Sequence, residues 1–409
     1  MSQSGQPAGK GREIRIVGLV CAAHFVSHYH LLLLPPVFEV VRTELGVSNL
    51  ALGAVLTAFN VISALLQTPA GFLVDRVGAR PMLIGGMMIG IVALLLAATF
   101  PTYWMLIAAY ALLGLANTVY HPADYSILSS TITANKAGRA FSFHTFSGFF
   151  GSGVAPACVL FCAAYAGWQG AYYAAAGLAA IVVAALVIWG APLSVGAVAR
   201  RAANASTSGR AGLDLLLSAP ILRNLFFFVL LALSGGGIQA FSVVALGQII
   251  GTPASTANIA LSAYLLLSAL GVLVGGLLAD RTSRHERIAA AGFLATSIMV
   301  VAVGWGDLGA AALIAAMGVG GLLNGIIQPS RDMIVRSVTP PGAFGKVFGF
   351  VSTGFNIGGM IAPLLYGWLL DRGEPRMVFA LVAAFILLAL FTVITRPKPQ
   401  PAPAATPAE

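Results

Sequence analysis

GFLVDRVGAR, residues 71–80, closes a long apolar run, and the related segment GLLADRTSR occupies residues 276–284. Two further pairs of segments repeat in the same order and at nearly the same spacing: GLANTVYHPADY (114–125) with GLLNGIIQPSRD (321–332), and AFSFHTFSGFFGSGVAP (140–156) with VFGFVSTGFNIGGMIAP (347–363). Self-similarity at a nearly fixed spacing indicates an internal repeat. The sequence therefore predicts two related halves.

Apolar side chains dominate the composition. The 409-residue chain is 58% hydrophobic and 9% charged, whereas soluble domains carry roughly 25% charged residues. No water-soluble fold has enough interior for this much apolar surface, so the sequence predicts a protein embedded in lipid. The apolar runs are too long for barrel strands, and a spanning helix needs about 20 residues. We predict an all-α membrane protein with twelve transmembrane helices, at residues 16–38, 50–74, 81–100, 103–130, 139–166, 170–193, 223–249, 257–279, 287–305, 309–335, 345–370 and 376–395.

The repeat divides these helices into two groups of six. An even number of helices per half gives both halves the same orientation, so they are parallel repeats about an axis along the membrane normal. The predicted organisation has five parts: a cytoplasmic N-terminal tail (1–13), an N-terminal six-helix half (14–193), a central cytoplasmic loop (194–222), a C-terminal six-helix half (223–396) and a disordered cytoplasmic tail (397–409).

The basic residues predict the orientation. With these helices, all of the Lys and Arg side chains except Arg42, Arg372 and Arg376 fall at one end of the bundle. Cytoplasmic loops carry the excess of Lys and Arg, so both termini are predicted to be cytoplasmic. The net charge of +9 reflects this bias, and we expect no nucleic-acid partner.

The segment 71–80 matches the motif G-x-L-x-D-R-x-G-x-R through Gly71, Leu73, Asp75, Arg76, Gly78 and Arg80. With two six-helix halves and a long central loop, the chain resembles the major facilitator superfamily (MFS) of secondary transporters over residues 14–396. The resemblance implies alternating access, in which the two halves rock about a central cavity.

The resemblance also implies a cytoplasmic latch. Its residues would be Asp75, Arg76 and Arg80, together with Asp280 and Arg281 of the second copy, where Ser283 replaces a glycine of the motif. A plain basic turn after a helix is the alternative interpretation.

Two histidine-containing segments, HFVSHYH (24–30) and YHPADYSIL (120–128), are similar to segments of fosmidomycin-resistance-type bacterial permeases. The G-P-x-x-G-G signature of drug–proton antiporters is not matched in the fifth predicted helix, which argues against a multidrug antiporter.

Polar side chains inside predicted helices are candidate functional groups, because charge at membrane depth is costly unless paired or hydrated. The helical rise of 1.5 Å per residue places His121 and His144 at one level in the cytoplasmic half. Asp124 shares a helix face with His121, and a His–Asp pair is suited to hold a proton. The repeat aligns Asp124 with Arg331, so we hypothesise an ion pair that gates the cytoplasmic side. Two unrelated charges that snorkel to the interface are the alternative.

His24 and His28 lie on one face of the first helix, with His24 near the midplane. They are candidates for binding substrate or protons. The alternative is that they only form hydrogen bonds with Ser, Asn or carbonyl groups of neighbouring helices. Two histidines alone form a poor metal site and no third ligand is apparent, so we expect no metal.

Further candidates for contacting a solute are neutral. Gln239 follows three glycines (235–237) that favour a break in the seventh helix or close helix packing. Asn324 and Asn356 supply amides that could hydrogen-bond a solute.

These features predict a secondary active transporter of a small organic solute, coupled to protons, with export favoured. An uptake permease for an anionic metabolite such as a carboxylate is one alternative, and a non-transporting sensor or scaffold on a transporter fold is another. No ATP-binding or hydrolase motif is present, so we expect neither a cofactor nor an enzyme. We expect a monomer, multi-pass in the bacterial inner membrane.

Overall fold

The structure is a computed structural model that describes residues 10–132, 134–193, 214–281, 284–339 and 344–394. Most of the predicted terminal tails and of the central loop, and Ser283 in the second motif copy, lie outside these residues. Every regular element in the described ranges is a helix.

Seven helices and two short 3-10 turns build the first half. Their bounds are α1 (Lys10–Leu31), η1 (Pro35–Val37), α2 (Phe38–Leu45), α3 (Asn49–Val77), α4 (Ala79–Thr99), α5 (Tyr103–Asn117), α6 (Tyr120–Thr131), α7 (Ala134–Trp189) and η2 (Ala191–Leu193).

The second half, like the first, is built of successive helices. Its helices are α10 (Ala219–Gly236), the π-helical turn η3 (Gly237–Phe241), α11 (Ser242–Ile250), α12 (Ala254–Asp280), α13 (His285–Trp305), α14 (Ala310–Ser337), α15 (Phe344–Asp371) and α16 (Pro375–Ile394).

Several predicted spans do not correspond to one helix each. The helix α7 is interrupted at Ala166 and Gly167, where Gly167 adopts a φ of 65°, so it contains the predicted fifth and sixth spans. The fourth span divides into α5 and α6. In the seventh span the predicted interruption takes the form of η3, and Gly237 packs against Val382 and Tyr366.

Ten segments of the described chain are long and apolar enough to cross a membrane. One of them, Arg139–Trp189, holds the two arms of α7, and α15 is not among the ten. The predicted number of twelve spans is thus not reproduced one for one.

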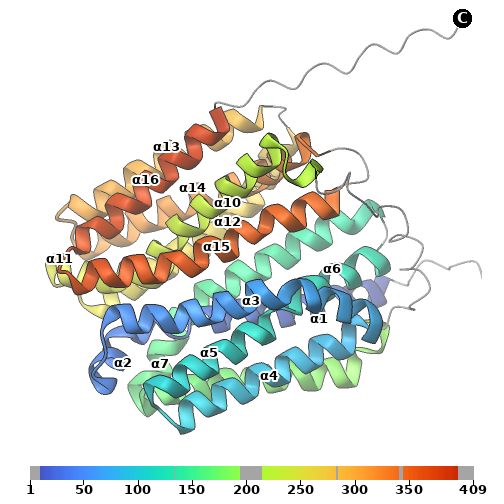
Figure 1. The fold of residues 1–409 in the computed structure, drawn as a ribbon, viewed down its shortest axis with the longest axis horizontal. Helices are drawn as coiled ribbons and strands as arrows, with labels where there is room; N and C mark the ends of the chain where they lie inside the picture. The colour runs from blue at the N-terminus through green and yellow to red at the C-terminus, as the bar shows by residue number, and fades with distance from the viewer. Residues whose placement is uncertain (1–9, 133, 194–213, 282–283, 340–343, 395–409) are drawn as a thin grey trace, which may run out of the picture.

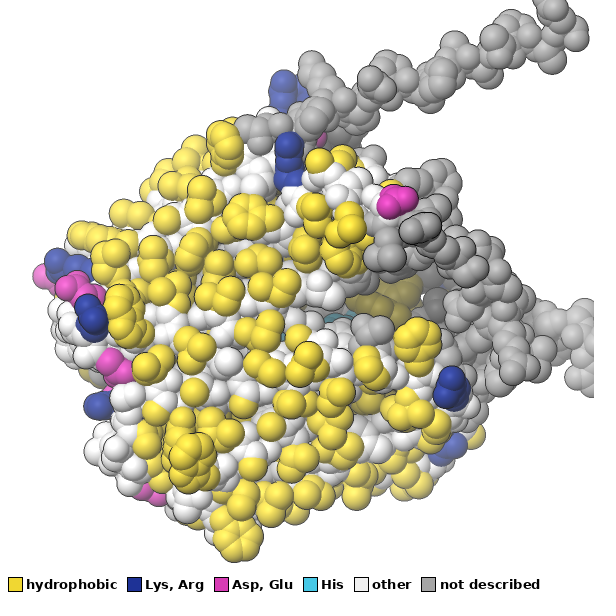
Figure 2. Space-filling model, in the orientation of Figure 1, with side chains coloured by type: hydrophobic (Ala, Val, Ile, Leu, Met, Phe, Trp, Pro, Cys, Tyr) yellow, Lys and Arg dark blue, Asp and Glu magenta, His cyan; other side chains and the backbone are white. Residues whose placement is uncertain are grey.

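The face of the molecule shown in Figure 2 is covered with apolar side chains, and Tyr165, at 81% exposure, is among the most exposed of the large hydrophobic residues. The protein is therefore a multi-pass membrane protein.

The two halves lie side by side, with α1–α7 in blue and green and α10–α16 in yellow to red (Figure 1). Helix α3 packs against α15, and α7 packs against α12. Glycines permit the close approach of α3 and α15, because a Cβ at Gly53 would lie 2.3 Å from the Pro363 carbonyl oxygen. Small residues allow such backbone contact between membrane helices.

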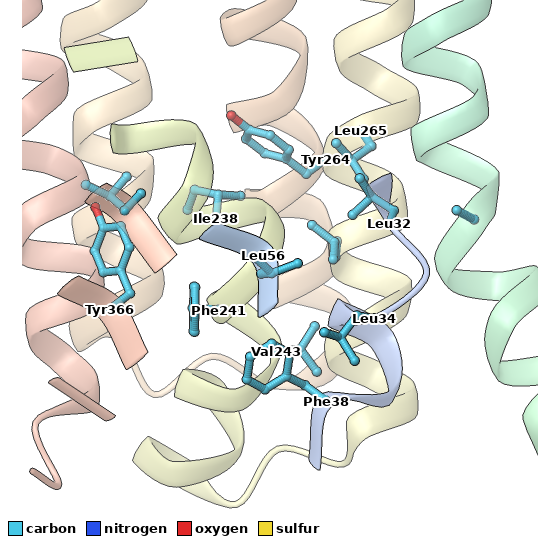
Figure 3. Close-up of a cluster of buried hydrophobic side chains, with 14 of the residues drawn as sticks. Leu32, Leu34, Phe38, Leu56, Ile238, Phe241, Val243, Tyr264, Leu265 and Tyr366 are labelled. Carbon is cyan, nitrogen blue, oxygen red and sulfur yellow. The ribbon is translucent and has the colours of Figure 1, made fainter. Parts of the chain in front are cut away.

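The end of the bundle that carries α2 and α11 is here called the opposite end (Figure 1). Leu32, Leu34 and Phe38 of the first half meet Phe241 and Val243 of the second (Figure 3). The Phe38 and Phe241 rings lie 5.3 Å apart.

The other end, here called the basic end, carries the start of α1 and the end of α16. Figure 2 shows a recess between the halves towards this end, with histidine surface (cyan) visible in it. The halves therefore pack together at the opposite end, and in the face shown a recess lies between them towards the basic end.

Candidate functional site: a buried histidine cluster

The histidine cluster begins on α1. His24 and His28 are one turn apart, and their ring centroids are 4.6 Å apart. The helix α1 lies close against α7 because α7 presents glycines to it: a Cβ at Gly148 would lie 2.6 Å from His24 Cε1 and 2.9 Å from His28 Cδ2, and a Cβ at Gly151 would lie 2.3 Å from the Phe25 carbonyl oxygen. These glycines of α7 thus make room for the imidazoles.

Close packing of α1 and α7 joins His24 to His144. Nδ1 of His24 donates to the His144 carbonyl oxygen at 2.8 Å, and the two rings stack with centroids 3.6 Å apart. A carbonyl oxygen only accepts, so this hydrogen bond places the His24 proton on Nδ1 and leaves the Nε2 lone pair free. Nε2 is buried and has no hydrogen-bond partner among the described residues.

Helix α6 supplies the remaining members of the cluster. Helix α5 ends at Asn117 and α6 begins at Tyr120, so Pro122 lies in the first turn of α6. Backbone N–H groups in a first turn have no intrahelical partner, so a proline is tolerated there. This start positions His121, whose ring lies 5.4 Å from His24 and 6.3 Å from His144. The predicted shared level of His121 and His144 is confirmed.

Asp124 provides the negative charge of the cluster. Its side chain is 0% exposed, and its Oδ2 accepts from Nε2 of His144 at 3.0 Å. The carboxylate therefore pairs with His144, whereas its helix neighbour His121 was the predicted partner. Pairing offsets part of the cost of a buried charge.

The predicted Asp124–Arg331 ion pair is not formed in this conformation, in which both residues are described. Arg331 pairs with Asp332 at 2.8 Å and lies over the rings of Phe228 and Phe355. The physical reason is that His144, on the neighbouring helix of the same half, already occupies the hydrogen-bonding position at Asp124 Oδ2. The predicted pair belongs to the state closed at the basic end and stays a prediction for that state.

Arg331 nevertheless lies near the cluster across the axis. Tyr125 is within electrostatic range of both Arg331 and Asp332, and its ring centroid lies 5.5 Å from that of His144. The recess therefore has a histidine-rich wall from the first half and an arginine on the side of the second.

The expectation that His24 and His28 lack a third ligand is wrong. One ring nitrogen from each of His24, His28 and His121 lies within 4.8 Å of the other two. Sequence spacing could not show this, because His121 is distant in the chain and is brought in by the packing of α6 against α1.

The neutral candidates lie outside the cluster. Gln239 is half-buried in η3, and the Asn324 carbonyl accepts from the Gln328 amide within α14. Asn356 donates to Gln67 Oε1 at 3.1 Å, so it joins α15 to α3 across the two halves.

Of the predicted latch residues, Arg80 makes defined contacts. Its guanidinium donates to the carbonyl oxygens of Leu186 and Val187 at 3.3 and 2.9 Å, near the end of α7. Cations stabilise helix C-termini in this way. Arg76 and Arg281 are exposed, and the side chains of Asp75 and Asp280 lie outside what the structure describes.

Sequence reasoning missed Asp371, at the end of α15. Its carboxylate accepts from the backbone N–H groups of Asn49 and Leu50 at 2.8 and 2.7 Å and from the Asn49 amide at 2.9 Å. These bonds join the two halves at the opposite end. An acidic residue next to a span end gives no sequence signal for this role.

Comparisons with known proteins agree with the geometry. The family model described as Major Facilitator Superfamily matches residues 20–246 and 225–409. The chain is 23% identical over 387 residues to the fosmidomycin resistance protein of Escherichia coli (strain K12), covering 92% of each chain. It is 26% identical over 370 residues to the multidrug resistance protein MdtH of Salmonella arizonae, covering 85% of each.

Solved structures share the fold. A bacterial homolog of the human lysosomal transporter Spinster, in an inward-facing and unoccupied conformation, superposes with a TM-score of 0.77 at 13% identity, covering 96% of this chain and all of that one. The nucleoside transporter NupG superposes with a TM-score of 0.71 at 16% identity, covering 94% of this chain and 98% of that one.

Proposed function

The chain belongs to the major facilitator superfamily, and on this premise we propose that it is a proton-coupled secondary transporter of a small organic solute. The observation that carries the proposal is the fully buried Asp124–His144 pair beside a recess open at the basic end. A transporter needs a site that gains and loses a proton and that communicates with one side at a time.

The pair meets the chemical requirement for coupling. A carboxylate and an imidazole can each bind or release a proton, and each proton alters the charge of this buried site. Within the described residues, Asp124 Oδ1 and His144 Nδ1 are buried without a hydrogen-bond partner, so each could bond a solute, a water molecule or a side chain once the site is opened.

In alternating access the two halves close at one end of the bundle while they separate at the other. The state described here is sealed at the opposite end by Asp371 and by the apolar cluster of Figure 3. In the reverse state the halves close at the basic end, where Arg331 would pair with Asp124 across the axis. Arg80 and the other motif residues would act as the latch at that end. The halves 14–193 and 223–396 move as units about the loop 194–222.

Export is the favoured direction. The names of the matched relatives, a fosmidomycin resistance protein and a multidrug resistance protein, support a role in removing small toxic solutes. Arg331 favours the second candidate, uptake of an anionic metabolite, because its guanidinium lies beside the recess and is planar enough to bind a carboxylate. The protein lies in the bacterial inner membrane with the basic end and both termini in the cytoplasm, and it functions as a monomer.

Proton flux in proteoliposomes tests the proposal. Purified protein is reconstituted with a pH-sensitive dye inside, and a panel of fosmidomycin, other antibiotics and small carboxylates is added. We expect at least one solute to drive proton movement in the wild type, and Asp124→Asn to abolish this movement while it retains solute binding.

The matched control is Asp307→Asn, which removes an exposed carboxylate at the opposite end and should leave proton flux unchanged. Solute transport in Asp124→Asn with undiminished proton flux would show that the pair does not couple transport. His24→Ala tests solute binding separately from proton coupling. Removal of this imidazole should weaken solute binding more than it changes the proton movement per solute transported.

A further inference from the structure

Three histidines of the cluster converge on one point from two helices. His24 and His28 come from α1 and His121 from α6, and one nitrogen of each lies within 4.8 Å of the other two. Imidazole nitrogen is a preferred ligand of zinc, copper and nickel ions. We propose that His24, His28 and His121 bind a divalent first-row transition-metal ion, with Zn²⁺ as the reference case.

The protonation state of His24 suits a metal ligand. Its Nδ1 donates to the His144 carbonyl oxygen at 2.8 Å, so Nε2 carries the lone pair. Metal-binding histidines commonly donate their other N–H to a backbone carbonyl, which fixes the ring and raises its basicity. Nε2 itself is buried and unpartnered, as expected of a ligand atom.

The other two rings are also available. Ser152 Oγ lies 3.4 Å from Nδ1 of His28 and orients that ring. Nδ1 of His121 is buried without a partner. The three proposed ligands therefore include two buried ring nitrogens, His24 Nε2 and His121 Nδ1, with no hydrogen bond within the described part of the chain, and a cation bound by their lone pairs would satisfy them.

The spacing requires only a small contraction. Tetrahedral zinc with Zn–N bonds of about 2.0–2.1 Å separates its ligand nitrogens by about 3.4 Å. From separations of up to 4.8 Å, the ligand nitrogens would have to approach one another by up to about 1.4 Å, and the half-buried side chains of His28 and His121 would move to do so. The absence of a Cβ at Gly148 leaves the room in which the His24 and His28 rings lie.

The electrostatic surroundings favour a cation. The buried carboxylate of Asp124 pairs with His144, whose ring stacks on that of His24 at 3.6 Å. The Asp124 carboxylate is thus separated from the proposed ligand His24 by the His144 ring, and its negative charge favours a cation held by three neutral ligands. Three protein ligands also leave one tetrahedral position for water or for a donor atom of a solute.

Metal retention by the purified full-length chain tests the site. The protein is prepared with an affinity tag that lacks histidine, incubated with Zn²⁺, desalted and analysed for metal, and its affinity is measured by competition with a chromophoric chelator. We expect about one Zn²⁺ per chain, and a loss of affinity of about 100-fold or more in His28→Ala and in His121→Gln.

His30→Ala is the matched control. His30 is also a buried histidine of α1, but it packs beside Gly90 of α4, away from the cluster, so zinc retention should equal that of the wild type. Equal retention in His28→Ala, His121→Gln and the wild type would overturn the proposal, as would the absence of zinc from the wild type.

X-ray absorption at the zinc edge of the wild-type protein needs no variant. We expect the scattering pattern of about three imidazoles, and a shell of oxygen ligands alone would overturn the proposal. Both measurements are made without solute or proton gradient, so their outcome is independent of the proton-flux experiment.

Discussion

Replacing Asp371 with alanine removes the carboxylate that ties the two halves together at the opposite end. In the structure this side chain accepts from the N–H groups of Asn49 and Leu50, at the first turn of α3, and from the Asn49 amide. The N-terminus of a helix has unpaired N–H groups and a partial positive charge, so an anion placed there is stabilising. The variant should therefore favour the state that is open at the opposite end.

The size of the shift follows from the bonds lost. Hydrogen bonds to a charged group contribute about 1.5–3 kcal/mol each when buried, and a capping interaction about 1 kcal/mol. Asp371 is exposed, and water solvates the same groups when the halves separate. We therefore expect a net loss of about 1.5 kcal/mol for the closed state, which changes the ratio of the two states about tenfold. Asp371→Asn keeps one acceptor oxygen and should give a smaller shift.

Spin-label distance measurements provide the assay. Labels at Val40 on α2 and Ser255 on α12 are exposed and report the separation of the halves at the opposite end. The matched control is Glu39→Ala, because Glu39 is an exposed carboxylate at the same end that pairs within its own helix with Arg42. The labelled variants are built in a background without the native cysteines Cys21, Cys158 and Cys162.

The expected result is a larger population of long distances in Asp371→Ala than in the wild type, with Asp371→Asn between them and Glu39→Ala unchanged. A distance distribution in Asp371→Ala that matches both the wild type and Glu39→Ala would refute the reasoning. It would show that the apolar cluster of Figure 3 seals this end without help from the carboxylate.

Two further predictions concern packing and the latch. Gly325→Ala places a Cβ 2.1 Å from the Ser268 carbonyl oxygen, where α14 packs against α12. This substitution should lower the thermal unfolding midpoint in detergent by several degrees. The control is Gly276→Ala, whose Cβ meets nothing within 4 Å and should leave the midpoint unchanged. Arg80→Gln removes the guanidinium contacts with the end of α7, and transport assays should show slower turnover than in Arg76→Gln; equal rates in the two variants would contradict a latch role for Arg80.

Most of the fold was predictable because its causes are local. Apolar runs of spanning length have to form helices in lipid, and the repeat required two related halves. The structure departs from the prediction where helices are irregular. The division of the fourth span near Thr118 depends on a local turn within a long apolar run, which hydropathy averages out, whereas the interruption of α7 at Ala166 and Gly167 falls at the predicted boundary between the fifth and sixth spans.

The site was only partly predictable. The depth arithmetic placed His121 and His144 together because both are counted from helix ends along a fixed rise. Which atoms meet was not predictable, since it depends on the rotation of each helix about its axis. Asp124 therefore pairs with His144, and Arg331 with Asp332, contrary to the alignment of the two copies.

The sequence by itself determined that this chain spans the membrane as two parallel helical halves, because hydrophobic composition and periodic repeats act over whole segments. The tertiary structure decided that His24, His28 and His121 converge and that Asp371 reaches Asn49 in the other half. Contacts between helices distant in the chain depend on how closely backbones approach. Here glycines such as Gly148 and Gly53 set that approach, and only the assembled bundle shows which surfaces they bring together.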